Sequence, residues 1–306
     1  MKALADKAYT GYKLWIREFS QYNQWEKFRM QTAADRRAGF KALHEKGRAF
    51  LMPNPFDIGS ARILDGMRFD ALATSSAGYA WTQGVRDAEG LITRDAALSH
   101  AADIISATSL PVNGDLENGF GDSPEDVVAT VKGAIEVGLA GCSIEDYTTQ
   151  PNNPYYPLDE AVERIRAAVD AKNRVAPDFV LTARSEGPVK TQHELDETIK
   201  RLNAFIAVGA DCVYAPQLKD KDQIAAVLSA VDAPMNVLAG RKNFHLTRKE
   251  LADMGVARVS IGPGLARIAL GAFVAAAEDM KDGGAFGCFD RAQGMSDFES
   301  FMKARP

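Results

Sequence analysis

The chain has 306 residues, of which 46% are hydrophobic and 25% are charged, and these are ordinary values for a globular protein with a full buried core. They exclude extensive disorder, and the length allows either one large α/β barrel or two smaller domains. The formal net charge of -5 argues against nucleic acid as a partner, because phosphate binding requires a basic surface.

The first thirty residues predict an amphipathic helix that precedes the main domain. Apolar side chains, among them Leu14, Trp15 and Phe19, recur at three- and four-residue steps with charged residues between them. This stretch contains no unbroken apolar run, so we expect neither a secretory signal nor a membrane-spanning helix. We therefore expect a helical extension over residues 1–30, a catalytic domain over 31–281 and a tail over 282–306 that packs on the barrel or on a neighbouring subunit.

Three widely spaced cysteines, Cys142, Cys212 and Cys288, form no CxxC motif. Their number and spacing indicate neither a disulfide framework nor a zinc site, and they are compatible with a reducing environment. We therefore predict a cytoplasmic protein without a membrane partner.

Eight short apolar runs follow the extension, and each precedes a segment with helical periodicity. The runs cover residues 49–54, 71–76, 111–117, 141–146, 179–185, 212–216, 235–240 and 258–263. The segments IEVGLAGC, IAVGADCV and ADMGVARV each place a glycine between a helix end and the next strand. Eight such units close a barrel, so we predict an α/β fold of the (β/α)8 TIM type. The rival is an open doubly wound sheet, which lacks support because no GxGxxG follows the first strand.

The second predicted strand ends in a run of small residues, SSAGYA. Ser75, Ser76 and Ala77 would let backbone N–H groups approach an anion, although such a run is also typical of a tight turn. Asp87 lies in the loop that follows. At the same mouth as further charged groups, these residues would form an oxyanion cradle.

The segment PVNGDLENGFGD, residues 111–122, carries the strongest functional signal. Asp115 and Glu117 point to one face of a strand end, because successive strand side chains alternate. They either flank a solvated turn or hold a cation or proton between them. Glu145 and Arg184 end the next two strands, and in a barrel all these ends meet at one mouth. The recurrence of charge therefore favours a metal site.

Carboxylate ligands completed by water suit Mg²⁺, or Mn²⁺, and leave positions for a chelating 2-oxo acid. The metal would polarise the ketone and stabilise the enolate formed when a bond to the adjacent carbon is broken or made. Arg184 would clamp a carboxylate or phosphonate through two oxygens, or else form a structural ion pair. Asn236, near the end of the seventh strand, either reaches the substrate or bonds backbone.

Taken together and in this order, SSAGYA, an Asp in the following loop, VNGDLENGFGDSPEDV, GCSIED and LTARSE resemble the isocitrate lyase and phosphoenolpyruvate mutase superfamily over residues 31–280. The resemblance implies a modified barrel whose last helix swaps between the subunits of a homodimer or homotetramer. It implies that Asp115 is the main Mg²⁺ ligand, and that Asp87, Glu117 and Glu145 hold the metal's waters. It also implies that Ser75, Ser76 and Ala77 bind substrate oxygens and that Arg184 binds the substrate anion.

One segment departs from the pattern of that family. Its lyases carry a Lys-Lys-Cys-Gly-His run after the fourth strand, whereas this chain has YTTQPNNPYYPLDEAVERI there. No Lys or Arg lies between Asp146 and Arg164, although phosphonopyruvate enzymes usually bring a basic residue to this loop. Tyr147, Tyr155 and Tyr156 either close over the substrate, supply a proton or simply pack.

We predict a Mg²⁺-dependent enzyme that cleaves or rearranges the C–C or P–C bond next to a 2-oxo acid through a metal-stabilised enolate. The expected catalytic residues are Arg184, Glu145 and Asp87, and the expected partner is a small 2-oxo acid or phosphonate. One alternative is a catalytically silent 2-oxo acid binding protein, since the lyase loop is missing. Another is a phosphosugar-binding barrel enzyme, because SIGPGLARIAL places a glycine-rich turn before the last helix.

Overall fold

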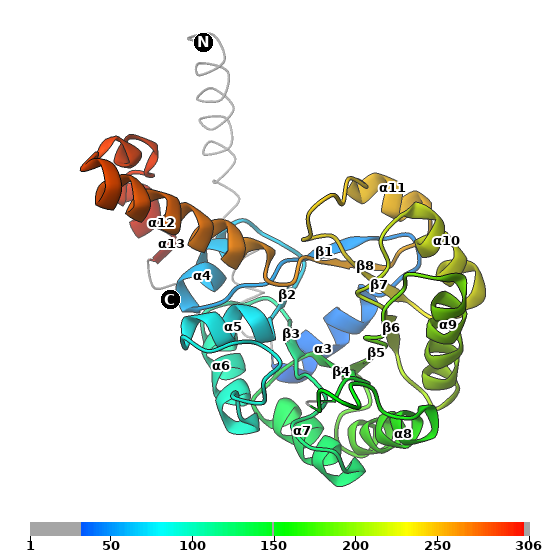
Figure 1. The fold of residues 1–306 in the computed structure, drawn as a ribbon. Coiled ribbons are helices and arrows are strands. Elements are labelled where there is room, and N and C mark those ends of the chain that lie inside the picture. The colour runs from blue at the N-terminus through cyan, green and yellow to red at the C-terminus, as the bar shows by residue number, and fades with distance from the viewer. Residues whose placement is uncertain (1–31, 149, 303–306) are drawn as a thin grey trace. The chain divides into compact units, whose positions relative to one another are not determined.

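A computed structural model describes residues 32–148 and 150–302 of the chain. Eight parallel strands form a nearly closed barrel with helices around its outside (Figure 1). The (β/α)8 prediction is therefore confirmed, and each of the eight expected apolar runs contains a strand. The helix expected over residues 1–30 lies outside the described residues, and the proposed domain boundaries stay predictions.

Each strand is short and lies inside its predicted run. The strands are β1 (Phe50–Met52), β2 (Leu72–Ala73), β3 (Val112–Asp115), β4 (Gly141–Glu145), β5 (Val180–Arg184), β6 (Cys212–Tyr214), β7 (Met235–Leu238) and β8 (Arg258–Ser260).

Helices connect the strands on the outside of the barrel (Figure 1). They are α4 (Ile58–Gly66), α5 (Ser76–Thr82), α6 (Arg94–Ser106), α7 (Pro124–Glu136), α8 (Leu158–Val175), α9 (Gln192–Ala207), α10 (Lys221–Ala230) and α11 (Arg248–Asp253). Helix α3 (Ala33–Ala42) precedes β1. After β8 come α12 (Gly264–Gly283), the short 3-10 helix η2 (Gly287–Arg291) and α13 (Met295–Met302).

The strand register brings the polar strand ends side by side. The sheet order is β1-β8-β7-β6-β5-β4-β3-β2, and all neighbouring strands in it are parallel. Glu145 lies opposite Arg184, and Arg184 lies opposite Tyr214. Between β1 and β2, the N–H of Ala73 donates to Pro53 O at 3.1 Å. The carboxyl ends of the strands therefore share one rim, as in other barrels of this type.

The helix boundaries follow from capping residues in the sequence. Gly138 and Gly209 have φ angles of 95° and 102° after α7 and α9, a conformation that glycine adopts without a Cβ penalty. Ser123 accepts a hydrogen bond from the N–H of Asp126 and forms a capping box ahead of Pro124. Ser123 therefore fixes where the rim loop after β3 ends, whereas the two glycines lie in the connections that lead into β4 and β6.

A buried arginine occupies the barrel interior below the rim. Arg258 is 1% exposed, its Nε donates to Asn236 Oδ1 at 3.0 Å, and its Nη2 donates to Thr182 Oγ1 at 3.0 Å. Its Nη1 lies 3.1 Å from Nε2 of His44, whose Nδ1 lies 2.8 Å from Phe40 O. A neutral imidazole that donates through Nδ1 and accepts through Nε2 satisfies both contacts.

The last helices leave apolar side chains in solvent. On α12, Ile268 is 70% exposed and Phe273 is 71% exposed. At the end of α13, Met302 O accepts a hydrogen bond from Nη1 of Arg62 on α4 at 2.9 Å. Within the described part of the chain, none of the helices combines the length and the apolar composition needed to cross a bilayer.

The His44 contact predicts how stability depends on pH. Burial, and then the charge of Arg258, lower the pKa of His44 from 6.5 to about 3. Because the unfolded chain takes up this proton first, we expect the free energy of unfolding to fall as pH drops from about 6.5 toward 3. His44→Gln should flatten this dependence by at most about 1.4 kcal/mol per pH unit in urea unfolding.

The control for this prediction is His245→Gln, which changes an exposed histidine in the loop after β7. That variant should keep the parental pH dependence of stability. An unchanged slope in His44→Gln would contradict a neutral histidine next to Arg258.

Candidate active site

A cavity of 310 Å³ lies at the rim formed by the carboxyl ends of the strands. Its walls come from the loops after β2 to β6 together with the ends of β4 and β5. The lining residues are Ser76, Asp87, Ala88, Glu117, Asn118, Glu145, Tyr147, Tyr155, Arg184, Glu186 and Gln217. The structure therefore brings together seven residues that the sequence singled out: Ser76, Asp87, Glu117, Glu145, Tyr147, Tyr155 and Arg184.

Arg184 joins the carboxylates of three strand ends. Its Nη1 lies 3.2 Å from Asp115 Oδ1 and 3.1 Å from Glu145 Oε2, and its Nε lies 2.6 Å from Glu186 Oε2. Burial by itself lowers the pKa of Arg184, but Glu145, Glu186 and Asp115 outweigh this and raise the pKa well above its usual value. The guanidinium therefore stays charged at the centre of the site.

Three carboxyl groups of the cavity, those of Asp87, Glu117 and Glu145, retain their protons more strongly than free carboxylic acids. Burial, followed by the charges of Asp115 and Asp87, raises the pKa of Glu117 to about 7. Burial also raises the pKa of Asp87, with Asp115 adding to the effect. The pKa of Glu145 is raised well above its usual value by burial, although Arg184 opposes the shift. This cavity thus holds an excess of buried negative charge, which a bound cation would relieve.

Asp115 is fixed by neighbours on β4, on α5 and just after β2. Its Oδ2 accepts from the N–H of Ser76 at 3.2 Å and from Ser76 Oγ at 3.3 Å, at the first turn of α5. Its Oδ1 accepts from Ser143 Oγ at 3.4 Å, and its own N–H donates to Thr74 Oγ1 at 2.8 Å. A carboxylate at a helix N-terminus is favoured by the orphan N–H groups of that end.

Four other predicted features lie away from the cavity. Ser75 is buried and caps α5 by accepting from the N–H of Gly78, and Ala77 is buried in the same first turn. The side chain of Asn236 donates to Ser260 Oγ at 2.9 Å and accepts from Arg258, so it lies in the barrel interior. The glycine-rich turn before α12 is likewise absent from the described residues that line the cavity.

The donor set at the rim fits a hard divalent cation. It consists of the carboxylates Asp87, Asp115, Glu117 and Glu145, whose oxygen atoms suit Mg²⁺. Across residues 32–148 and 150–302, no three His, Cys, Asp or Glu side chains form a group that could hold a metal by themselves. This arrangement suits an ion with few direct protein ligands and several bound waters, which is the coordination that Mg²⁺ favours.

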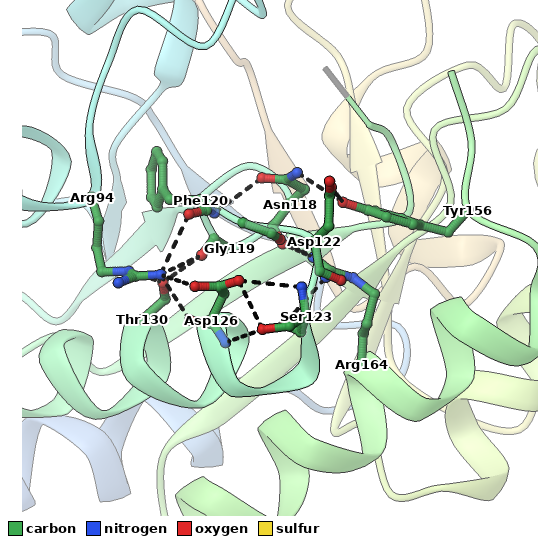
Figure 2. Close-up of polar contacts among 11 residues, drawn as sticks. Arg94, Asn118, Gly119, Phe120, Asp122, Ser123, Asp126, Thr130, Tyr156 and Arg164 are labelled. Carbon is green, nitrogen blue, oxygen red and sulfur yellow. Dashed lines mark hydrogen bonds and ion pairs between the residues drawn. The ribbon is translucent and has the colours of Figure 1, made fainter. Parts of the chain in front are cut away.

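Glu117 lies in a loop with unusual backbone geometry. Glu117 and Phe120 have φ angles of 47° and 58°, in the left-handed region that side chains other than Gly, Asn and Asp seldom adopt. Such a conformation persists only where the surrounding contacts enforce it. The N–H of Glu145 donates to Glu117 O at 2.9 Å, and two arginines from neighbouring helices contact the residues that follow, as Figure 2 shows.

Arg164 and Arg94 donate to successive carbonyl groups of this loop (Figure 2). Arg164, on α8, donates to the carbonyls of Asn118 and Asp122, to Gly121 O at 2.9 Å and to Ser123 O at 3.3 Å. Arg94, on α6, donates to Phe120 O at 3.4 Å and to Gly119 O at 3.5 Å. The six carbonyls from residue 118 to residue 123 thus all face a guanidinium group.

Tyr156 ties this loop to the segment after β4 (Figure 2). Its hydroxyl donates to Asp122 Oδ1 at 2.6 Å and accepts from Asn118 Nδ2 at 3.0 Å. The guanidinium of Arg164 lies over its ring, 4.2 Å from the centroid. The loop after β3 and the segment after β4 are therefore held as one unit.

Sequence reasoning missed Arg94 and Arg164. Arg164 does carry a signal, because it lies on the buried stripe of α8 with Ala161, Ile165 and Ala168. A charged residue on an apolar helix face implies a buried partner, but the sequence does not say which one.

The segment after β4 brings two tyrosines to the cavity. Tyr147 and Tyr155 pair as an antiparallel bridge, and their ring centroids lie 5.7 Å apart in an edge-on arrangement. The N–H of Thr148 donates to Pro154 O at 2.8 Å, which closes the segment further. This wall of the cavity therefore consists of phenol rings.

Comparisons with known proteins agree with this geometry. Residues 40–281 match the family model of phosphoenolpyruvate phosphomutase. The 2-methylisocitrate lyase of Shewanella oneidensis is 35% identical over 198 residues, which cover 61% of this chain and 65% of that enzyme, slightly less than two thirds of its length.

Two solved structures extend the likeness to the fold. A Burkholderia cenocepacia J2315 protein, named provisionally as a lyase/mutase, is 47% identical with a TM-score of 0.84, over 89% of this chain and 97% of that chain. Oxaloacetate acetylhydrolase, solved with its product oxalate, is 26% identical with a TM-score of 0.77, over 88% of this chain and 94% of that chain.

The Arg164 contacts predict a cost for removing this side chain. Arg164→Met leaves buried carbonyls without donors, so we expect the free energy of unfolding to fall by about 1–3 kcal/mol. Arg166→Met is the matched control on the same helix, because the Arg166 side chain is 53% exposed and, among the described residues, forms an ion pair only with Glu163. The control should change stability by less than about 0.5 kcal/mol in urea unfolding. An equal loss of stability in the two variants would contradict the role of Arg164 in holding the loop after β3.

Proposed function

The chain belongs to the phosphoenolpyruvate phosphomutase family, within the isocitrate lyase and PEP mutase superfamily, and we propose that it is a Mg²⁺-dependent enzyme that breaks or rearranges the C–C or P–C bond next to a 2-oxo group. The observation that carries this proposal is the cluster of Asp115, Glu145 and Arg184 on three adjacent strand ends. The substrate is a small 2-oxo acid or phosphonate. The named relatives, which include a methylisocitrate lyase and an oxaloacetate hydrolase, support this class of substrate.

Asp115 would hold the Mg²⁺ ion directly, and Asp87, Glu117 and Glu145 would hold its waters. When bound, the ion supplies positive charge beside the ketone oxygen, which favours the enolate form of the substrate. The raised pKa values of Asp87 and Glu117 support this assignment, since a cation would relieve the repulsion that raises them.

Arg184 orients the substrate by binding the substrate's carboxylate. Its planar guanidinium is held at Nε by Glu186, while its Nη1 contacts the two carboxylates, Asp115 and Glu145, that lie at the metal site. A cation at that site would compete for these carboxylates, so that Nη1 becomes available to a substrate oxygen. Ser76 holds Asp115 in place through both its N–H and its hydroxyl group. Tyr147 and Tyr155 cover the side of the cavity and limit the access of water.

One alternative is a protein that binds the substrate in this pocket but does not catalyse the reaction. None of the residues from Tyr147 to Tyr156 is a Lys, Arg, His or Cys, so this segment brings no strongly acidic or basic catalyst besides its tyrosines. A protein that binds a 2-oxo acid with Mg²⁺ and releases it unchanged would have this composition. Turnover of the substrate separates the two possibilities.

The exposed apolar residues on α12 support a homo-oligomer. Ile268 and Phe273 are both largely in solvent within one chain, and a helix face of this kind usually packs on a partner. We propose that α12 packs on a second copy of the chain, in a homodimer or homotetramer in which the last helix is exchanged. The cytoplasmic location stays a prediction.

Asp115→Ala tests the metal-dependent reaction. Turnover of oxaloacetate, substituted malates, methylisocitrate and phosphonopyruvate is followed by NMR, with Mg²⁺ and again with excess chelator. We expect chelator-sensitive turnover of one of these compounds and a loss of more than about 100-fold in the variant, since even removing a residue that merely supports a metal ligand costs 10- to 100-fold. Asp103→Ala, which changes an exposed aspartate on α6, should retain full activity. Undiminished turnover by Asp115→Ala would overturn the assignment.

Introducing charged residues on the exposed apolar face of α12 tests whether the chain forms a homo-oligomer. Ile268→Glu combined with Phe273→Glu should lower the mass measured by light scattering to that of one chain, because buried charges disrupt an apolar interface. Val175→Glu introduces the same charge at a side chain on α8 that is 55% exposed, and it should leave the mass unchanged. A monomeric parent protein would contradict the proposal directly.

A further inference from the structure

We propose that the substrate of this cavity is a 2-oxo monocarboxylate whose remaining part, here called the tail, carries no second negative charge. This inference rests on the proposed function and specifies its substrate class. Two observations support it: the charge of the cavity walls, and the chemistry of the residues that would face the tail.

The charges that line the cavity are strongly unequal. Asp87, Glu117, Glu145 and Glu186 contribute carboxylates, whereas Arg184 is the one cation among the described residues of the lining. Arg184 already pairs with Glu186 through Nε, and with Asp115 and Glu145 through Nη1. One substrate carboxylate can share this guanidinium and a divalent cation. A second anionic group would meet carboxylates without a further positive charge to balance them.

Another part of the cavity wall is polar without being basic. Tyr147 and Tyr155 contribute phenol groups, and Gln217 contributes an amide. The Nε2 of Gln217 donates to Glu186 Oε1 at 3.3 Å, so a carboxylate oxygen lies at this side of the cavity. A hydroxyl group on the tail would donate a hydrogen bond to such an oxygen, whereas a carboxylate or phosphonate would be repelled by it.

The segment after β4 cannot supply the missing charge. Its sequence contains no Lys or Arg from Tyr147 to Glu163, and the bridge between Tyr147 and Tyr155 places phenol rings at the wall. Tyr156 anchors the same segment to Asp122 and Asn118. Closure of this segment over a substrate would therefore bring aromatic and amide groups and no cation.

Arg241, in the loop after β7, is the residue that most directly challenges the inference. Its Nη1 donates to Pro216 O at 3.1 Å, next to Gln217, and its Nη2 is buried without a hydrogen-bond partner among the described residues. Its guanidinium lies 5.5 Å from the ring centroid of Phe244 and is not part of the cavity lining. If Arg241 turned into the cavity, it would recruit an anionic tail, so it belongs in the test.

The test compares two ligands of similar shape that differ in the charge of the tail. Oxaloacetate ends in a carboxylate, and 4-hydroxy-2-oxobutyrate ends in a neutral hydroxymethyl group. Each is used to displace oxalate from the full chain in the presence of Mg²⁺, and NMR reads both the displacement and the integrity of the ligands. We expect the hydroxy acid to displace oxalate at a concentration at least about tenfold lower, a ratio that corresponds to about 1.4 kcal/mol.

A charge series at Gln217 provides matched variants, because this side chain is exposed and tolerates substitution. Gln217→Arg should improve displacement by oxaloacetate at least about threefold relative to the hydroxy acid, and Gln217→Glu should weaken it. Arg241→Met should leave the preference for the hydroxy acid unchanged.

Each result bears on a different part of the argument. Equal or better displacement by oxaloacetate would overturn the inference, and loss of that displacement in Arg241→Met would identify Arg241 as the cation that was overlooked. Oxalate binding that persists in excess chelator, or fails with Mg²⁺, would instead overturn the proposed metal site. The proposed function and the further inference therefore fail by separate readouts.

Discussion

The cavity is organised by the attraction between one guanidinium and several buried carboxylates. Arg184 reaches Asp115, Glu145 and Glu186, which belong to the ends of β3, β4 and β5. Without that charge, these groups would repel one another in a site that already raises the pKa values of Glu117 and Glu145. Removing one partner of a buried ion pair is costly because the other charge stays buried, so the geometry of the rim depends on this residue.

Three further arginines support the site, mainly through neutral oxygen or nitrogen acceptors, although Arg94 also pairs with the carboxylate of Asp126. Arg258 fills the barrel interior and bonds Asn236, Thr182 and His44. Arg164 and Arg94 bind the carbonyls of the loop that carries Glu117. The cavity therefore lies on a rigid polar base, and its open side is bounded by the tyrosine pair. Rigid support of this kind keeps reacting groups in place without reorganisation during the reaction.

The sequence predicts the parts of this structure that repeat along the chain. Strand runs, helix caps and charged strand ends recur at each unit, so the barrel and the convergence of Asp87, Glu117, Glu145 and Arg184 were accessible without coordinates. The roles of Arg164 and Tyr156 were not, because each bonds a segment more than thirty residues away through contacts that leave no periodic mark. Asn236 and Ser75 lie within expected strand runs, but their side chains bond to neighbouring groups of the fold and do not line the cavity. Local patterns therefore reveal elements, whereas long-range polar contacts require the packed structure.

The loop after β3 is held by two arginines through its carbonyl groups, and the same loop leaves little room for side chains. A Cβ at Gly121 would collide with the carboxyl group of Asp126, and Gly119 has a φ angle of 91°, which other residues seldom adopt. A larger residue at either position would therefore push the loop away from Arg164 or Arg94. The place of the Glu117 carboxylate thus depends on two glycines that do not line the cavity themselves.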